Sequence, residues 1–235
     1  MTTPFCRGQA VAADGTPSAY RLLGQAFFRT ELPRLLQRTE IRVLDVGCGG
    51  GRMSDFLADA GFCGTYVGID ISDRFIRDTD GSKGFLRQFI HGDAHDLPET
   101  ETYDLVFSNS ALEHIPHDHR LLAKLDRLVA PGGMQVHIVP GGWALPLYLW
   151  HGYRQYSLAR IAALLGTDRT HVYRLGGLAC FVLHLMFITV GEILLRLKLR
   201  DSFPRIYRML LNRAIALDQL LRICPGMYIV CRSAA

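Results

Sequence analysis

The sequence lacks the cysteine patterns that hold a zinc ion or form a redox pair. Its six cysteines include no C-x-x-C pair, and none has a histidine at zinc-finger spacing. They are Cys6, Cys48, Cys63, Cys180, Cys224 and Cys231. We therefore expect no metal site, and we expect reduced, partly buried thiols in a cytoplasmic protein.

The chain also has no internal repeat, no low-complexity tract and little net charge. Residues 1–8 are not a basic start followed by an apolar run, so no signal peptide is predicted. The net charge of +4 is a mild bias, smaller than most nucleic-acid binders concentrate on one face. With 49% hydrophobic and 20% charged residues, a chain of 235 residues is expected to fold as one domain.

Short apolar segments alternate with amphipathic segments in the middle of the chain. The predicted strands are 41–46, 65–70, 86–91, 103–107 and 134–139. The predicted helices are 52–60, one that begins at the cap Ser72-Asp73, and 119–129, which Pro131-Gly132-Gly133 closes. This alternation predicts an α/β fold with a parallel sheet and right-handed crossovers.

The flanking segments complete the predicted organisation. A lead-in helix is expected at 20–37, a helix capped by Ser157 at 157–165, and strands at 170–175 and 227–231. We divide the single domain into a tail and lead-in helix (1–40), a core (41–140), and a substrate-side loop, helical insertion and closing strand (141–235).

Acidic residues stand at the ends of three predicted strands. Asp45 opens the glycine-rich turn 45–51, Asp70 ends the next strand about twenty residues after the turn, and Asp93 follows the third. A glycine turn alone fits many strand–helix connections. Three strand-end carboxylates in series, however, are expected at the sheet edge where ligands bind in open α/β sheets. There Asp70 can accept from ribose hydroxyls and Asp93 from an adenine amine.

These segments resemble the motifs of class I S-adenosylmethionine (SAM)-dependent methyltransferases, in particular the ubiquinone/menaquinone methyltransferase-like (type 11) group. The matching motifs, in the family's order and spacing, are 43–52, 67–72, 92–98, 103–109, 112–115 and 128–133. The resemblance covers 20–140 well and the remainder loosely. It implies a Rossmann-like sandwich with a mostly parallel seven-stranded sheet, an antiparallel last strand and a C-terminal helical insertion.

The resemblance also implies SAM as the cofactor and a role for individual residues. The methionine part of SAM would pass along Gly47 and Gly49, and Asp45 would act through bound water or the amino group. The remaining implied contacts are Asp70 with the ribose, Ile71, Asp93 and Ala94 with the adenine, and Ser108 and Asn109 near the sulfonium.

Two histidines are candidates for a catalytic base, which helps when the acceptor is a hydroxyl. His114 follows the fourth strand on the cofactor side, although a histidine here is often structural in the resemblance group. His151 lies in the predicted substrate-side loop. Otherwise, methyl transfer mainly requires a dry site that aligns the acceptor with the methyl group.

A missing motif narrows the acceptor. Nucleic-acid amino-methylating enzymes of this fold resemble one another in an Asn/Asp-Pro-Pro-aromatic box after the fourth strand, whereas this chain has Ser-Asn-Ser-Ala at 108–111. No glutamate pair brackets a loop, as it does in arginine methyltransferases. We predict no nucleic-acid partner and O-methylation of a small-molecule, sugar or lipid-linked acceptor such as a glycolipid. Methylation of a quinone or other metabolite, and a non-catalytic SAM-binding regulator, stay open.

The C-terminal third contains the most apolar stretch, residues 178–195. His184, Glu192, Arg196 and Arg200 recur at four- and eight-residue intervals, which predicts one narrow polar stripe on a broadly apolar helix. A spanning helix needs about 20 mostly apolar residues. A helix packed on the core or on a second copy, a helix on a membrane or over a lipid-linked acceptor, and a true span all stay open.

Basic residues follow the apolar stretch. They are Lys198, Arg200, Arg205, Arg208 and Arg213, with Asp201 as the opposing charge. Residues 178–213 are therefore a candidate for peripheral contact with anionic lipid head groups. A solvated helix face would carry the same residues, and a homodimer is the other partner considered.

Overall fold

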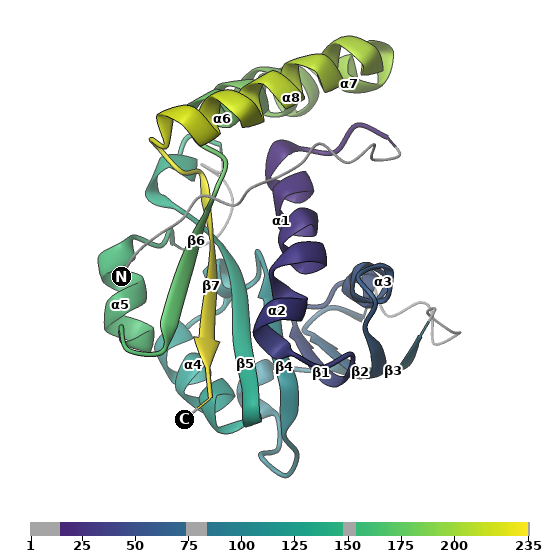
Figure 1. Cartoon of the computed structure of the whole chain (residues 1–235), viewed down its shortest axis with the longest axis vertical. Coiled ribbons are helices and arrows are strands. Elements are labelled where there is room, and N and C mark those ends of the chain that lie inside the picture. Colours follow the sequence, from purple (N-terminus) through teal and green to yellow (C-terminus); the bar gives the residue numbers. More distant parts are fainter. Residues whose placement is uncertain (1–14, 74–83, 148–153, 235) are drawn as a thin grey trace.

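A seven-stranded sheet forms the centre of the molecule (Figure 1). The computed structural model describes residues 15–73, 84–147 and 154–234. The strands are β1 (Glu40–Val46), β2 (Cys63–Asp70), β3 (Phe85–His91), β4 (Tyr103–Asn109), β5 (Val129–Pro140), β6 (Thr170–Leu175) and β7 (Met227–Ser233). Their order is β3-β2-β1-β4-β5-β7-β6, and β7 runs antiparallel to both of its neighbours. The predicted mixed sheet with an antiparallel last strand is confirmed.

Helices cover both faces of this sheet and make a three-layer sandwich (Figure 1). One face packs against α1 (Ala19–Thr30), α2 (Leu32–Leu36) and α3 (Arg52–Asp59), and the other against α4 (Asp118–Arg127) and α5 (Leu158–Leu165). Successive strand residues point to opposite faces, so Val43 enters the first core and Leu44 the second. Both are fully buried, as the apolar run in β1 predicts for a central parallel strand.

The lead-in helix predicted at 20–37 is two helices. Ser18 caps α1, and its hydroxyl accepts a hydrogen bond from the backbone N–H of Arg21 (3.3 Å). The chain leaves α1 at Glu31 and begins α2 with Pro33 in the first turn. Proline lacks an N–H to donate and is tolerated only at a helix start, so it ends the first helix and begins the second.

The boundaries on either side of Leu128 also differ from the prediction. Helix α4 ends at Arg127, two residues early, and β5 begins at Val129, ahead of the predicted start at 134. Val129 pairs with Tyr103, and the register between β4 and β5 then shifts before Leu105. The Pro-Gly-Gly segment therefore lies within an irregular strand and does not separate helix from strand. The predicted helix after Ser72-Asp73 falls in 74–83, outside the described residues.

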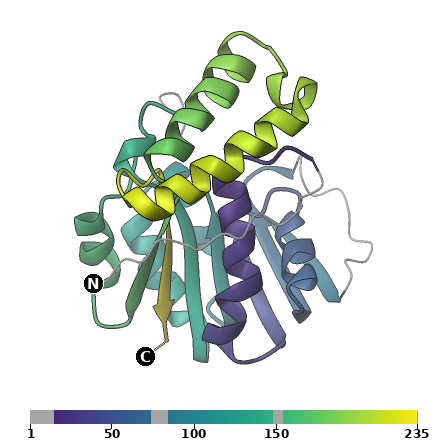
Figure 2. The same ribbon diagram turned by 45° about the horizontal axis from the view of Figure 1, so that its top comes forward.

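The segment 178–221 forms a helical layer at one end of the molecule, which we call the helical cap (Figures 1 and 2). It contains α6 (Leu178–His184), the π-helix Leu185–Leu194, α7 (Leu199–Ser202) and α8 (Pro204–Leu221). The carboxylate of Asp218 in α8 accepts hydrogen bonds from the backbone N–H groups of Gly177, Ala179 and Cys180 (2.6–2.9 Å). The buried Asp218 carboxylate therefore caps the N-terminus of α6 and joins α8 to it.

The polar stripe predicted along one helix is not continuous. The first helical segment ends at Leu194, and Arg200 lies in α7, beyond a turn at Arg196 with positive φ. The turn folds Arg200 back, so that its Nη2 lies 2.6 Å from a carboxylate oxygen of Glu192. No helix within the described ranges is both long and apolar enough to cross a bilayer.

Candidate active site

The turn between β1 and α3 brings the backbone close to a neighbouring loop. Gly47 has φ +74°, and a Cβ built on it would lie 2.4 Å from the Cβ of Ala111. Its N–H donates to the carbonyl of Ile69 at the end of β2 (2.8 Å). Only glycine combines this backbone conformation with so close an approach. The tight turn predicted at 45–51 therefore exists, pressed against the loop that follows β4.

Asp70 is held in a fixed orientation at the carboxyl end of β2. One carboxylate oxygen accepts from the N–H of Gly49 and the other from the N–H of Ser72, each at 2.9 Å. Each oxygen of a carboxylate has a second lone pair. The side chain can therefore accept further hydrogen bonds from a ligand without losing its orientation.

Two cavities flank Gly47. The first, of about 410 Å³, is bounded by α1, and we call it the α1 cavity. Among its lining residues are Asp45, Gly47, Cys48, Asn109 and Ser110. The second, of about 240 Å³, is the Asp70 cavity, lined among others by Asp70, Ile71, Asp93, Ala94 and His114. Gly47 and Ser110 line both, so an elongated ligand can cross the glycine turn and occupy both cavities.

A buried carboxylate lies in the wall of the α1 cavity. Asp45 is 2% exposed, and the hydroxyl of Tyr66 donates a hydrogen bond to it. Burial raises the pKa of Asp45 to about 7, although the Tyr66 hydrogen bond opposes this shift. A cation bound in this cavity would favour the ionised form. The sequence analysis does not predict this contact of Tyr66, because no sequence pattern pairs Tyr66 with Asp45.

Two arginines also line the α1 cavity. Arg21 projects from α1, where its guanidinium stacks over the ring of Phe56 (5.6 Å), and Arg52 is the first residue of α3. Neither guanidinium forms an ion pair with a carboxylate in the part of the chain that the structure describes. The cavity thus presents both an acidic group and unpaired cations, which suits a ligand with charges of both signs.

Asp93 has a structural role as well as a place in the Asp70 cavity. One carboxylate oxygen accepts from the backbone N–H of His95 and contacts Nδ1 of its ring, both at 2.9 Å. These hydrogen bonds lower the pKa of Asp93, the backbone one most strongly. The carboxylate therefore stays ionised and caps the short 3₁₀ helix Ala94–Asp96.

The structure separates Ser108 from the other predicted site residues. Its side chain is fully buried, and its hydroxyl lies 2.8 Å from Nδ1 of His137, while Asn109 faces the α1 cavity. His137 Nε2 contacts the amide oxygen of Gln135, which makes Nε2 the protonated nitrogen and Nδ1 the acceptor. Burial lowers the pKa of His137 to about 3, so the ring is neutral.

The two histidines predicted as bases have different outcomes. His114 is exposed and lines the Asp70 cavity but not the α1 cavity. His151 lies outside the described residues. Of the predicted cofactor residues, Asp70, Ile71, Asp93 and Ala94 come together in one cavity, and Asp45 and Asn109 in the other; Gly47 joins the two.

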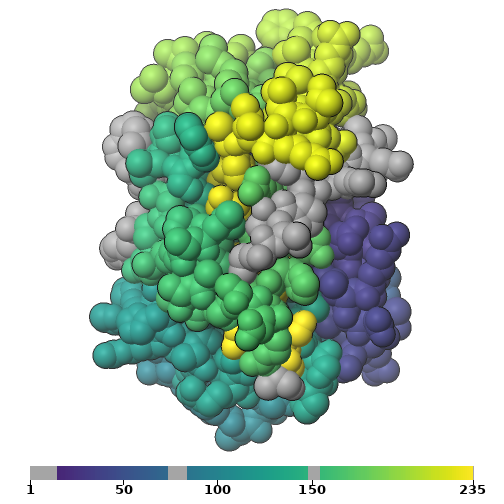
Figure 3. All heavy atoms as spheres, turned by 60° about the vertical axis from the view of Figure 1, so that its left-hand side comes forward, coloured from purple at the N-terminus to yellow at the C-terminus, as the bar shows by residue number. Residues whose placement is uncertain are grey.

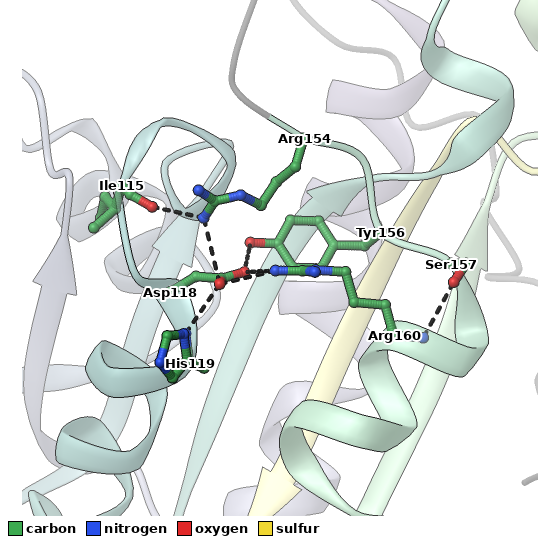
Figure 4. Close-up of polar contacts among 7 residues, drawn as sticks. All are labelled: Ile115, Asp118, His119, Arg154, Tyr156, Ser157 and Arg160. Atoms are coloured by element: carbon green, nitrogen blue, oxygen red, sulfur yellow. Dashed lines mark hydrogen bonds and ion pairs between the residues drawn. The ribbon is translucent and has the colours of Figure 1, made fainter.

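An ion cluster around the buried carboxylate of Asp118 joins the loops beside the site (Figure 4). Asp118, at the start of α4, accepts two hydrogen bonds from Arg160 Nη2 (2.8 and 2.9 Å) and one from the hydroxyl of Tyr156 (2.9 Å). Arg154 lies 3.4 Å from Asp118 and donates to the carbonyl of Ile115 (2.7 Å). Burial alone would raise the pKa of Asp118, but the hydrogen bonds from Arg160 and Tyr156 lower it. The cluster fixes the segment before α5 against the loop after β4.

Asp118→Asn is expected to destabilise the fold by about 2 kcal/mol, because the buried carboxylate loses its charge-assisted hydrogen bonds from Arg160. Urea unfolding followed by circular dichroism measures this change. Glu99→Gln is the matched control, since Glu99 pairs with Arg127 at the exposed surface and should leave the unfolding midpoint unchanged. Equal stability of Asp118→Asn and the wild type would contradict the role of the cluster.

Comparison with known proteins matches residues 44–136 to the methyltransferase domain family. The chain is 32% identical over 143 residues to a ubiquinone biosynthesis O-methyltransferase of Hydrogenovibrio crunogenus, covering 57% of this chain and 54% of that protein. It is 33% identical over 94 residues to a phthiotriol/phenolphthiotriol dimycocerosates methyltransferase of Mycobacterium leprae, covering 39% of this chain and 35% of the other. The chain thus spans about half, or less, of the length of these relatives.

Solved structures share the fold across nearly the whole chain. The plantazolicin methyltransferase BpumL, solved in complex with S-adenosylhomocysteine (SAH), aligns with a TM-score of 0.57 over 92% of this chain and 84% of its own. Its sequence identity is 15%, so the likeness is one of fold.

Proposed function

We propose that this chain, whose residues 44–136 match the methyltransferase domain family, is a class I SAM-dependent methyltransferase of the ubiquinone methyltransferase group and transfers a methyl group from SAM to a small-molecule acceptor. The observation that carries the proposal is the pair of cavities joined at Gly47, with Asp70 held in one and Asp45 buried in the wall of the other. SAM consists of an adenosine group joined to a charged amino-acid group, so each of its two ends can occupy one of the two cavities.

The adenosine end belongs in the Asp70 cavity. The two oxygens of Asp70 can accept from the 2′ and 3′ hydroxyls of a ribose, in charge-assisted hydrogen bonds. Ile71 is 75% exposed beside it, so its side chain is free to pack against the flat face of an adenine. Asp93 and Ala94 are the residues that would contact the adenine edge. Gly47 lines both cavities and carries no side chain, so a ligand that crosses from one cavity to the other can lie against its backbone.

The amino-acid end belongs in the α1 cavity. Arg21 and Arg52 are the cations that can hold its carboxylate, and Asp45 is the anion that can favour its ammonium group. Bound SAM supplies an activated methyl group on a cationic sulfur. The chain's own contribution is to bind the donor, to exclude water and to align the acceptor, which is worth on the order of 7–11 kcal/mol in well-oriented reactions.

The acceptor enters, in this proposal, from the side of α1. A third cavity of about 720 Å³ shares Ser18, Arg21, Gln25 and Phe56 with the α1 cavity. We call it the cap cavity, because His184, Ile188 and Arg200 of the helical cap also line it. The names of the relatives, which refer to ubiquinone biosynthesis and to phthiotriol dimycocerosates, support a small-molecule or lipid acceptor. We propose a lipid-linked acceptor and O-methylation, with a quinone-like metabolite as the second candidate.

This geometry changes the role proposed for His114. His114 lines the Asp70 cavity but not the α1 cavity, on whose side the acceptor is proposed to enter. We therefore assign His114 to the adenosine side. His114→Ala is expected to weaken SAM binding severalfold and to leave kcat at saturating SAM within about twofold. A loss of kcat of a hundredfold or more with normal SAM binding would restore the base role.

SAM affinity should rise with pH around neutrality. The pKa of about 7 leaves Asp45 half protonated at neutral pH, and the cationic ligand favours the ionised form. SAM binding should therefore release a proton and tighten from about pH 6 to about pH 7.5. Calorimetry in two buffers of different ionisation enthalpy measures both effects. In Asp45→Asn only the ligand's own ionisation remains, so SAM affinity should rise less with pH than it does in the wild type. An identical pH profile in both proteins would contradict the role of Asp45.

The activity itself is tested with the purified chain, SAM, and a panel of lipid-linked sugars, quinols and small hydroxylated metabolites. Formation of SAH that depends on one acceptor class supports the proposal and identifies the class. Tight SAM binding without turnover on any acceptor would favour the regulatory alternative. The predicted cytoplasmic location, the homodimer and the exclusion of nucleic acid stay predictions.

A further inference from the structure

The helical cap exposes most of the large apolar side chains that face solvent. Among the described residues, those exposed elsewhere are Ile71, Leu86, Trp143 and Leu145. The remainder lie in the cap, or at Ile223 directly after it: Leu178, Val182, Met186, Ile193, Leu194, Leu195, Leu197, Phe203, Ile206, Met209, Leu217, Leu220, Leu221 and Ile223. The helical cap that carries them forms the layer at the top of Figures 1 and 3. A concentration of exposed apolar side chains in one layer of this kind indicates contact with another apolar phase.

Helix α8 has two apolar faces. Tyr207 and Leu211 are buried against the rest of the molecule, whereas Ile206, Leu217 and Leu220 are exposed. At about 100° per residue, the exposed set is turned by about 120° from the buried set. A helix that only covers the domain needs one apolar face, so the second is unexplained by folding.

A groove continues this outer face between α8 and α6. It has a volume of about 310 Å³, and its lining includes Val182, Met186, Leu210 and Leu217. Arg213 is the one charged side chain in its lining. The groove is thus an apolar channel bordered by a cation.

The carboxylates of the cap are all engaged within the molecule. Glu192 accepts two hydrogen bonds from Arg200 (2.5 and 2.6 Å), and Asp201 accepts one from the hydroxyl of Thr16 (2.9 Å). Asp218 is buried and caps the first backbone N–H groups of α6. Asp201 is thus the one carboxylate of the cap that keeps an exposed charge without an ion pair in the described ranges, and the cations around it outnumber it.

The cations of the same surface have no such partners. Six exposed basic residues between 195 and 223 form no ion pair with any residue in the described ranges. They are Arg196, Lys198, Arg205, Arg208, Arg213 and Arg222. Uncompensated lysines and arginines beside exposed apolar side chains are the composition of helices that lie in the interface of an anionic membrane.

We propose that the helical cap docks on an anionic lipid bilayer and lies in its interface without spanning it. The charge pattern selects this occupant over a second copy of the chain. A second copy docked face to face would bring the same unpaired cations together, whereas anionic head groups neutralise them. Because the cap also lines the cap cavity, docking would bring that cavity close to the bilayer, and this consequence rests on the proposed lipid-linked acceptor.

The test is flotation of the full chain, without SAM or acceptor, on vesicles of phosphatidylcholine alone and of phosphatidylcholine mixed with phosphatidylglycerol. Binding to the anionic vesicles should be at least tenfold stronger and should weaken as salt is added. Leu217→Gln with Leu220→Gln should reduce it at least tenfold, as should Arg205→Gln with Arg208→Gln and Arg213→Gln. Because SAM is absent, the result is independent of the methyltransferase proposal.

Two controls have matched exposure elsewhere on the surface. Leu86→Gln on β3 and Arg120→Gln on α4 should float as the wild type does. All the substituted side chains are exposed, so thermal unfolding should be unchanged and a folding defect is detected directly. Wild-type protein that stays unbound at low salt, or Leu217→Gln/Leu220→Gln protein that binds normally, would overturn the proposal. So would a concentration-dependent dimer, seen by sedimentation without lipid, that the same double substitution abolishes.

Discussion

Asp70→Asn is expected to weaken SAM binding at least tenfold, about 1.4 kcal/mol. The carboxylate at the end of β2 is oriented by the N–H groups of Gly49 and Ser72 and retains the capacity to accept from two ribose hydroxyls. Asparagine has nearly the same shape but lacks the charge and one acceptor. Isothermal titration calorimetry with SAM, and with SAH, measures the loss.

The matched control for this substitution is Asp96→Asn. Asp96 is exposed three residues after Asp93 and lines neither the Asp70 cavity nor the α1 cavity. Its replacement should leave both affinities unchanged. Wild-type affinity in Asp70→Asn would remove the ribose role and, with it, the assignment of the adenosine end to this cavity.

Gly47→Ala is expected to lower SAM affinity about a hundredfold, about 2.7 kcal/mol. The added Cβ would meet Ala111 at 2.4 Å, in a backbone conformation with φ +74° that alanine disfavours. The turn and the loop after β4 must then move apart. Both line the Asp70 cavity, and a displacement of about 1 Å in a binding site can cost a factor of a hundred.

A second substitution separates the collision from the backbone strain. Gly47→Ala combined with Ala111→Gly removes the atom that the new Cβ would meet, so part of the affinity should return. Gly61→Ala is the control for strain alone, since Gly61 has φ +91° but nothing within 4 Å of its would-be Cβ. It should lower stability slightly and leave SAM affinity unchanged. If Gly61→Ala and Gly47→Ala behaved alike, close approach at Gly47 would have no part in binding.

The strand pattern predicted the sheet because its information is local. Continuous β-branched runs such as 41–46 and the alternation with helical spacing determine strands buried on both faces. Strand order follows from short, right-handed connections. Two of the predictions were wrong. The single lead-in helix is divided at Pro33, and Val129 belongs to β5 and not to the preceding helix, because it pairs with Tyr103 of β4.

The candidate site was predictable only for residues that end strands. Asp45, Asp70 and Asp93 share an edge because parallel strands end there, and the structure brings each of them to a cavity wall. Tyr66 and Arg21 depend on how layers pack, and the sequence contains no pattern that reports this packing. Ser108 and Asn109 illustrate the limit, since adjacent strand residues face opposite ways and only Asn109 reaches the cavity.

The position of the helical cap in the sequence was predicted, but its division into separate helices was not. Its composition indicated an apolar helix followed by cations, and both exist. The sequence contains no pattern that predicts the π-helix or the turn at Arg196, across which Arg200 contacts Glu192. The partner of each carboxylate in the cap likewise depends on tertiary packing, so the sequence alone does not predict how much negative charge stays exposed there.

The central claim is that one chain of atoms, from adenosine to a charged amino acid, binds across Gly47. Calorimetry of the full chain with SAM and SAH tests it most directly. The account predicts binding of both with one site per chain, weakened at least tenfold by Asp70→Asn and unchanged by Asp96→Asn. Heats of dilution alone for both ligands, from protein that circular dichroism shows to be folded, would contradict it.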